Sequence, residues 1–111
     1  MQDKAIDPKA LASILGDDIS LHMPILNKFV VQTEELLTGF ETAYADHDVE
    51  QVRFHAHKFK SSARTVGANK LADLCLALET AARSNDWTEI SALVGQLRPE
   101  VERVRVCVAE M

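Results

Sequence analysis

The sequence predicts an all-α fold, an antiparallel four-helix bundle with a short N-terminal capping helix, on three observations. Only four glycines and three prolines occur in 111 residues, so long stretches carry no helix-breaking residue. Apolar residues recur at steps of three and four, whereas strand-like alternation extends over a few residues only. With 47% apolar residues, the chain can build one hydrophobic core, and we expect residues 1–111 to form a single domain.

Two helices are expected in the first 44 residues. Asp7 can cap a short helix that has Pro8 at its first position and ends at Gly16, with inward positions at Leu11, Ile14 and Leu15. A second helix should begin between residues 18 and 23 and run to about Tyr44, with Pro24 near its start. Its inward face would carry Leu26, Phe29, Val30, Thr33, Leu37, Phe40 and Tyr44.

Three more helices are expected after the polar break at 45–48. The third has a buried stripe of Val49, Val52, Ala56, Phe59, Ala63 and Val66. Gly67 suits the position after its end, and Asn69 can cap a fourth helix with Leu71, Leu74, Cys75, Leu78 and Ala82 inward. After a turn at 84–86, the last helix would bury Trp87, Ile90, Leu93, Val94, Leu97, Val101, Val104 and Val108, with a kink at Pro99.

Charge and composition exclude several classes of protein. Twelve Lys and Arg oppose 17 Asp and Glu, and this net charge of −5 disfavours general binding to nucleic acid or to an anionic membrane. The N-terminal residues lack the apolar core of a signal peptide, and no apolar run is long enough to span a membrane. Cys75 and Cys107 form no paired motif, which favours a reducing compartment and packing roles. A cytoplasmic protein is expected.

The third helix carries an uneven distribution of charge. Between Glu50 and Asp73 there is no acidic residue, whereas five basic residues lie in this window, namely Arg53, Lys58, Lys60, Arg64 and Lys70. On charge alone, this pattern is also explained by a solvated helix face.

His57 makes this basic segment more specific. On a helix its direction lies roughly 125° from the apolar stripe, so the imidazole should face solvent. Phe54, Lys60, Ser61 and Arg64 are its neighbours on the helix surface. An exposed imidazole beside a hydroxyl and cations suits a nucleophile that accepts and holds an anionic group, above all a phosphoryl group.

Two segments carry a resemblance to a known family. AHKFKSSARTVGA at 56–68, followed by LADLCLALE at 71–79, closely resembles the signature of histidine-containing phosphotransfer (HPt) domains of bacterial multistep phosphorelays. The resemblance implies that His57 is the phosphorylated residue, that Lys60 lies near the phosphoryl group, and that Gly67 and Ala68 form the following turn. The family usually has glycine where this chain has Ser61, which is small enough to leave activity in place.

The resemblance also implies a carrier rather than an enzyme. The expected partners are receiver domains of response regulators and a hybrid sensor histidine kinase, with the protein itself a free-standing monomer. No cofactor is expected on this chain, because Mg²⁺ and the aspartyl phosphate would belong to the receiver. Lys60, Ser61 and Arg64 would stabilise the phosphoryl group, and a set of neighbouring side chains would dock the partner, namely Arg53, Phe54 and Lys58.

Three alternatives compete with this interpretation. A metal site is disfavoured because His55 and His57 point about 160° apart and because His22 and His47 fall near helix ends. General-base catalysis is disfavoured because His57 is expected to lack a carboxylate partner on its flank. The remaining alternative is an adaptor of the same fold that binds a receiver or kinase without transferring phosphate.

Overall fold

The computed structural model describes residues 4–111, which contain five helices and no strand. The all-α prediction is confirmed. The helices are α1 (Pro8–Leu15), α2 (Ile19–Ala45), α3 (Val49–Val66), α4 (Asn69–Arg83) and α5 (Trp87–Ala109).

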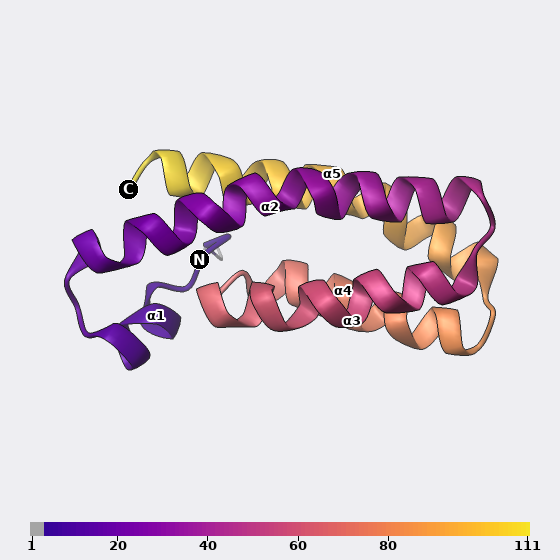
Figure 1. The fold of residues 1–111 in the computed structure, drawn as a ribbon, viewed down its shortest axis with the longest axis horizontal. Coiled ribbons are helices and arrows are strands. Elements are labelled where there is room, and N and C mark those ends of the chain that lie inside the picture. The colour runs from indigo at the N-terminus through magenta and orange to yellow at the C-terminus, as the bar shows by residue number, and fades with distance from the viewer. Residues whose placement is uncertain (1–3) are drawn as a thin grey trace.

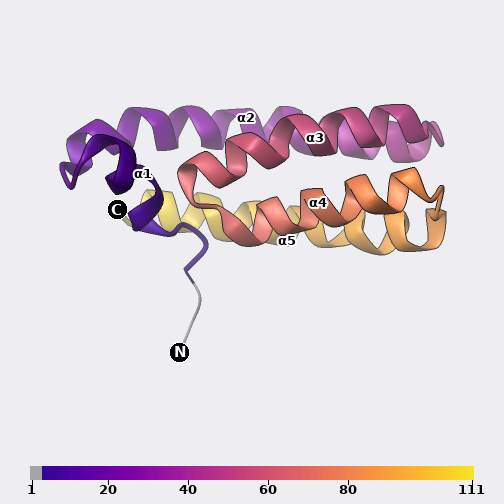
Figure 2. The same cartoon turned by 90° about the horizontal axis from the view of Figure 1, so that it is seen from below.

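The four long helices lie side by side along the long axis of the molecule, and each runs opposite to the one before it in the chain (Figures 1 and 2). Helix α3 packs on α2 and α4, and α5 also packs on α2 and α4. The contact between α3 and α4 is the most extensive. The short α1 packs against α2 and α3 at one end of the molecule.

Aspartate side chains cap the N-termini of four of the five helices. Asp7, Asp18, Asp48 and Asp86 each accept a hydrogen bond from a backbone N–H of the first turn, which satisfies donors that have no partner inside the helix. The prediction for Asp7 is thus confirmed.

The prediction that Asn69 caps α4 is wrong. Gly67 adopts the left-handed conformation, with φ of 83°, and its N–H bonds back to the end of α3. The N–H of Ala68 donates to the carbonyl of Ala63 at 2.8 Å. Because this C-terminal motif uses both Gly67 and Ala68, the cap position of α4 falls on Ala68 and Asn69 is already helical.

Gly67 also joins the N-terminal segment to α3. The N–H of Asp7 donates to the Gly67 carbonyl at 2.9 Å, and a Cβ at Gly67 would lie 2.4 Å from the carbonyl oxygen of Asp7. Only glycine allows this close approach together with the left-handed backbone. Helix α1 is therefore held at the end of α3.

The residues predicted to face inward on α3 and α4 form the middle of the core. Most of the residues predicted to face inward on α2 and α5 are buried as well. Two predicted core residues are exposed instead. Ile14 lies on the outer side of α1, which has only two turns and buries Leu11. Tyr44 keeps its ring near Trp87 and donates its hydroxyl to Ser91 at 2.9 Å. Leu36, which the sequence pattern omitted, is fully buried.

The two internal prolines do not end their helices. Helix α2 continues through Pro24 and α5 continues through Pro99. The expected kink at Pro99 stays a prediction.

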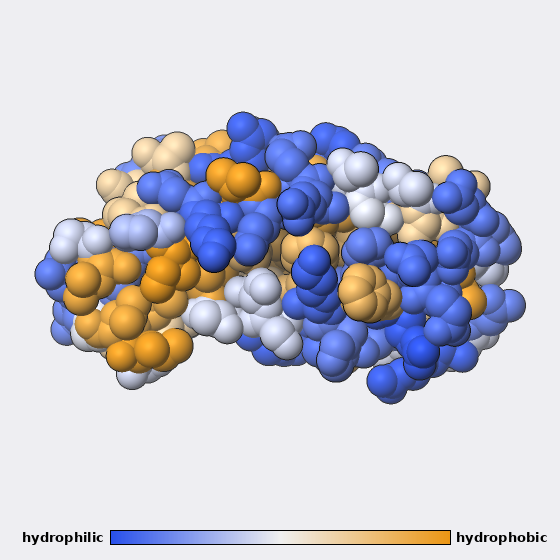
Figure 3. All heavy atoms as spheres, in the orientation of Figure 1, coloured by the Kyte–Doolittle hydropathy of each residue, from blue (hydrophilic) through white to orange (hydrophobic). Residues whose placement is uncertain are grey.

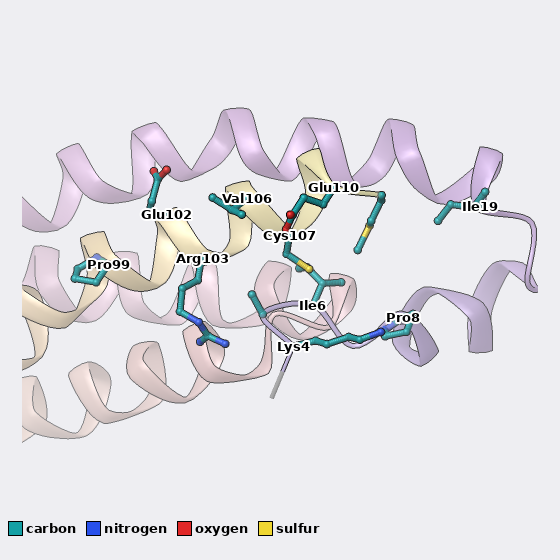
Figure 4. A pocket seen from close by; sticks show the side chains of 12 residues that line it. Lys4, Ile6, Pro8, Ile19, Pro99, Glu102, Arg103, Val106, Cys107 and Glu110 are labelled. Atoms are coloured by element: carbon teal, nitrogen blue, oxygen red, sulfur yellow. The ribbon is translucent and has the colours of Figure 1, made fainter. Parts of the chain in front are cut away.

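A cavity of about 680 Å³ lies between the N-terminal segment and α5 (Figure 4). Ile6, Val106 and Cys107 are among its lining residues, and none of the lining residues belongs to α3 or α4. No helix within residues 4–111 has the length and apolarity needed to cross a membrane.

Candidate functional site

The geometry of α3 places His57 on the outside of the bundle. Val52, Ala56 and Phe59 are buried against the other helices, which turns the intervening His57 outward. Its side chain is 72% exposed, as the helical spacing predicts. The surface around α3 in this view is mainly hydrophilic, whereas apolar atoms gather over α1 and the start of α2 (Figure 3).

The imidazole of His57 has a carboxylate partner on α4. Nδ1 of His57 lies 3.0 Å from Oε2 of Glu79, whose side chain is only 6% exposed. The expectation that His57 lacks such a partner is therefore wrong. Helical spacing identifies neighbours of His57 on α3 only, whereas Glu79 comes from α4, the helix that packs most extensively on α3.

This contact selects the tautomer of the neutral imidazole. An ionised carboxylate only accepts hydrogen bonds, so Nδ1 must carry the ring proton and its N–H group donates a hydrogen bond to Glu79. Nε2 is then the nitrogen with the free lone pair. The exposed ring is thereby oriented by a buried group, with one nitrogen available for nucleophilic attack.

Glu79 is kept ionised by the cations around it. Nζ of Lys60 donates to Oε1 of Glu79 at 2.8 Å, and a guanidinium nitrogen of Arg83 lies 3.7 Å from Oε2. The hydrogen bond from Lys60 lowers the pKa of Glu79 most, and the bond from His57 and the charges of Lys60 and Arg83 lower it further, while burial opposes them.

The residues predicted to stabilise a phosphoryl group have different surroundings. Lys60 is half-buried and bonds to Glu79. The guanidinium of Arg64 lies 4.0 Å from Asp73 of α4. Ser61 is exposed, and within residues 4–111 its hydroxyl has no hydrogen-bond partner. The ring is thus oriented by Glu79 without help from Ser61, and the roles of Lys60, Ser61 and Arg64 stay predictions.

A surface hollow of about 500 Å³ lies beside His57, on the side away from Arg64. Its lining residues are Glu50, Gln51, Arg53, Phe54, His57, Glu79 and Arg83. Phe54 is 57% exposed there, as predicted. Arg53 is paired with Glu50 at 2.9 Å. Lys58 lies outside the hollow, with its ammonium 5.3 Å from the ring centroid of Phe59. Two of the three predicted docking residues, Arg53 and Phe54, therefore share this hollow with His57.

Within residues 4–111, no hydrogen bond or ring contact joins the other histidines to His57 or Glu79. Nε2 of His22 lies 2.7 Å from the carbonyl oxygen of Gly16, and the ring of His47 stacks on Trp87 at 3.6 Å. His55 packs between α2 and α3 among phenylalanine rings. Among residues 4–111, no three His, Cys, Asp or Glu side chains are grouped as metal ligands.

The two cysteines are free thiols. Cys75 is fully buried in the core, and burial raises the pKa of its thiol to about 12. Cys107 is partly buried and packs against the core. Both positions agree with the packing roles expected from the sequence.

Sequence reasoning missed Glu79 and Arg83 as members of the site. A signal for Glu79 was present, because it directly follows the buried Leu78 and lies four residues after the buried Cys75. A carboxylate at the margin of a buried stripe needs a partner from another helix. Arg83 lies one turn after Glu79 and could have been found from it.

Comparisons with known proteins agree with this geometry. The family model described as "Hpt domain" matches residues 24–106. The structure of histidine-containing phosphotransfer protein B (HptB) from Pseudomonas aeruginosa PAO1 superimposes with a TM-score of 0.88. The sequence identity is 29%, and the match covers 98% of this chain and 95% of the other. No curated protein sequence matches the chain significantly.

Proposed function

Because the chain belongs to the Hpt domain family and is a histidine phosphotransfer carrier of phosphorelays, we propose that His57 is the residue that carries the phosphoryl group. The observation that supports this most strongly is the hydrogen bond between Nδ1 of His57 and the buried Glu79. It orients an exposed imidazole and leaves Nε2 as the nucleophilic nitrogen. Within residues 4–111, the other three histidines lack such a carboxylate bond.

The transfer step follows from this geometry. The lone pair of Nε2 attacks the phosphorus of an aspartyl phosphate on the partner, the bond from phosphorus to the aspartate oxygen breaks, and the carboxylate leaves with the electron pair. A positive charge develops on the ring as the nitrogen–phosphorus bond forms. Ionised Glu79 stabilises this charge by accepting the hydrogen bond from the Nδ1–H group.

Cations on both sides of His57 can receive the phosphoryl oxygens. Arg83 and Arg53 line the hollow beside the ring, and Lys60 and Arg64 lie toward the other side. Arg83 faces the same hollow as His57 and comes from α4, so we add it to the residues expected to contact the phosphoryl group.

The protein acts as a carrier, and we expect the partner to supply the remaining chemistry. We assign Mg²⁺ to the receiver domain, where it would neutralise charge on the phosphoryl group. The expected partners are receiver domains and a hybrid sensor kinase, which would cover Phe54 and the neighbouring Arg53 as they approach His57. We further assign α2–α5 as an antiparallel four-helix bundle capped by α1 and propose that the protein acts as a monomer.

The decisive experiment uses a receiver domain phosphorylated with acetyl phosphate in the presence of Mg²⁺. The wild type and the control His47→Asn should acquire phosphate that is acid-labile and stable to base, whereas His57→Gln should acquire none. Asparagine suits the positive φ of residue 47, so the control should fold normally. Circular dichroism checks that all three proteins remain helical.

Two outcomes would contradict the proposal. Phosphate retained by His57→Gln would assign the site to another residue. Binding of the phosphorylated receiver without transfer to the wild type would instead support an adaptor.

A further inference from the structure

His55 is a partly buried histidine that the phosphotransfer site does not use. It is two residues before His57 on α3, and its ring packs against α2. Its ring centroid lies 5.9 Å from that of Phe40, 5.5 Å from that of Phe54 and 6.4 Å from that of Phe59. Its Nδ1 atom is buried and has no hydrogen-bond partner.

The ring lies directly on the backbone of α2. A Cβ at Gly39 would lie 2.9 Å from both Cε1 and Nε2 of His55, closer than side chains normally approach. Glycine at this position therefore allows the imidazole to fill the space between α2 and α3. The contact explains a glycine in the middle of a long helix, where it otherwise lowers helix stability.

Protonation is unfavourable in this arrangement. The neutral ring can leave Nδ1 as an unprotonated nitrogen in the apolar contact, but the imidazolium places an N–H donor there with no acceptor. Burial lowers the pKa of His55 most, and the positive charge of Lys58 lowers it further.

The charged groups that face His55 are few. Lys58 lies on the same helix, and Asp46 and Asp48 line a hollow of about 230 Å³ that His55 also lines. Neither aspartate bonds to the ring, and Asp48 caps α3 through the N–H of Gln51. The α2 residues at this hollow carry no charge, namely Thr38, Gly39, Thr42 and Ala43.

We propose that His55 is a pH-sensitive packing element, whose neutral ring holds α2 against α3 and whose protonation loosens this contact and moves Phe54. The movement reaches Phe54 because the two rings are in edge contact, and Phe54 lines the hollow beside His57. This proposal does not depend on which residue carries the phosphoryl group.

The direction of the pH effect follows from the lowered pKa. The unfolded chain takes up a proton on His55 near the ordinary value of 6.5, whereas the folded chain does so at lower pH. The folded state is therefore unaffected by this group well above 6.5 and loses stability as pH falls from 6.5 toward the folded value.

Two measurements test the proposal. In the wild type, NMR titration should show the His55 ring protonating below 6.5, with the Phe54 ring signals changing at the same midpoint. In denaturant unfolding across the same pH range, the folding equilibrium constant of the wild type should fall several-fold more than that of His55→Phe. The control His47→Asn, which removes a histidine from the α2–α3 turn, should keep the wild-type pH dependence.

Either measurement can overturn the proposal. A His55 midpoint at or above 6.5, or Phe54 signals that do not follow it, would show that the ring is not a packing element of this kind. The same pH dependence in His55→Phe as in the wild type would show that other groups carry the effect. The NMR titration needs no variant, so it decides the question even if His55→Phe fails to fold.

Discussion

Glu79 of α4 accepts a hydrogen bond from Nδ1 of His57 on α3 at 3.0 Å, and through the same carboxylate it holds Lys60 at 2.8 Å. A single buried acid thus orients an exposed imidazole and a half-buried ammonium on the neighbouring helix. This relationship makes the contact between α3 and α4 part of the chemistry as well as part of the fold.

The orienting role of Glu79 predicts a loss of transfer rate in Glu79→Gln. Glutamine has the same shape and retains an oxygen that can accept a hydrogen bond from the Nδ1–H group, but it cannot stabilise the positive ring by charge. We expect transfer from a phosphorylated receiver to slow about tenfold, since a charge-assisted bond contributes about 1.4 kcal/mol more than a neutral one. Single-turnover kinetics at saturating receiver measures this. Glu102→Gln, on α5, is the control, and equal rates in all three proteins would refute an orienting role.

The same carboxylate predicts a loss of stability in acid. The pKa of Glu79 is lowered from its ordinary value of 4.5, chiefly by the hydrogen bond from Lys60. Its ionised form therefore stabilises the fold above 4.5, and this contribution is lost as pH falls through the lower folded value. Urea unfolding on both sides of pH 4.5 should show a smaller acid-induced loss of unfolding free energy for Glu79→Gln than for the wild type and Glu102→Gln. The same dependence of unfolding free energy on pH in all three proteins would show that Glu79 does not make this contribution.

Lys60 and Arg64 should differ in their effect on stability. Lys60→Ala removes the principal partner of a buried carboxylate, and we expect the free energy of unfolding to fall by about 1–2 kcal/mol. Arg64 is half-exposed and 4.0 Å from Asp73, so Arg64→Ala should cost less than about 0.5 kcal/mol.

Urea denaturation compares the two variants. A larger loss of unfolding free energy in Arg64→Ala than in Lys60→Ala would contradict the prediction. Arg64→Ala should instead slow encounter with an acidic receiver, most at low ionic strength. Stopped-flow association at two salt concentrations measures that effect.

Phe54 is expected to contribute to receiver binding more than to folding. Its ring is largely exposed beside His57, so truncation in Phe54→Ala should weaken binding by about 1 kcal/mol, roughly fivefold in Kd. The free energy of unfolding should change by less than about 0.5 kcal/mol. Calorimetric titration with a receiver tests this, with Val106→Ala on α5 as an exposed apolar control. A large drop in melting temperature would show instead that Phe54 supports the core.

Ser61→Gly should change transfer only modestly. Within residues 4–111 the Ser61 hydroxyl has no partner and Glu79 already orients the ring, so we expect a rate within about tenfold of the wild type. Glycine should lower helix stability by about 1 kcal/mol, which Ser61→Ala should not. Transfer from one phosphorylated receiver to all three proteins makes the comparison. A hundredfold faster rate in the glycine variant would identify Ser61 as an obstruction.

Most of the fold was predictable because it depends on local patterns. The steps of three and four between Val52, Ala56, Phe59 and Ala63 identify the buried side of α3 without reference to any other helix. Apart from the buried Leu36 in the middle of α2, the incorrect predictions of the fold lie near the ends of helices. Asn69 was expected as a cap, but the turn at Gly67 and Ala68 takes up that position, and the outcome depends on how two helices join.

The sequence by itself determined that His57 is exposed, that cations surround it on α3, and that the chain resembles the phosphotransfer family. These follow from spacing within one helix and from a local motif. Only the tertiary structure decided which groups from other helices contact the histidines of α3. Glu79 reaches His57, and Gly39 accommodates His55, because α3 packs at one particular register against α4 and α2. That register arises from the packing of all the buried side chains together, and the periodicity of a single helix carries no information about it.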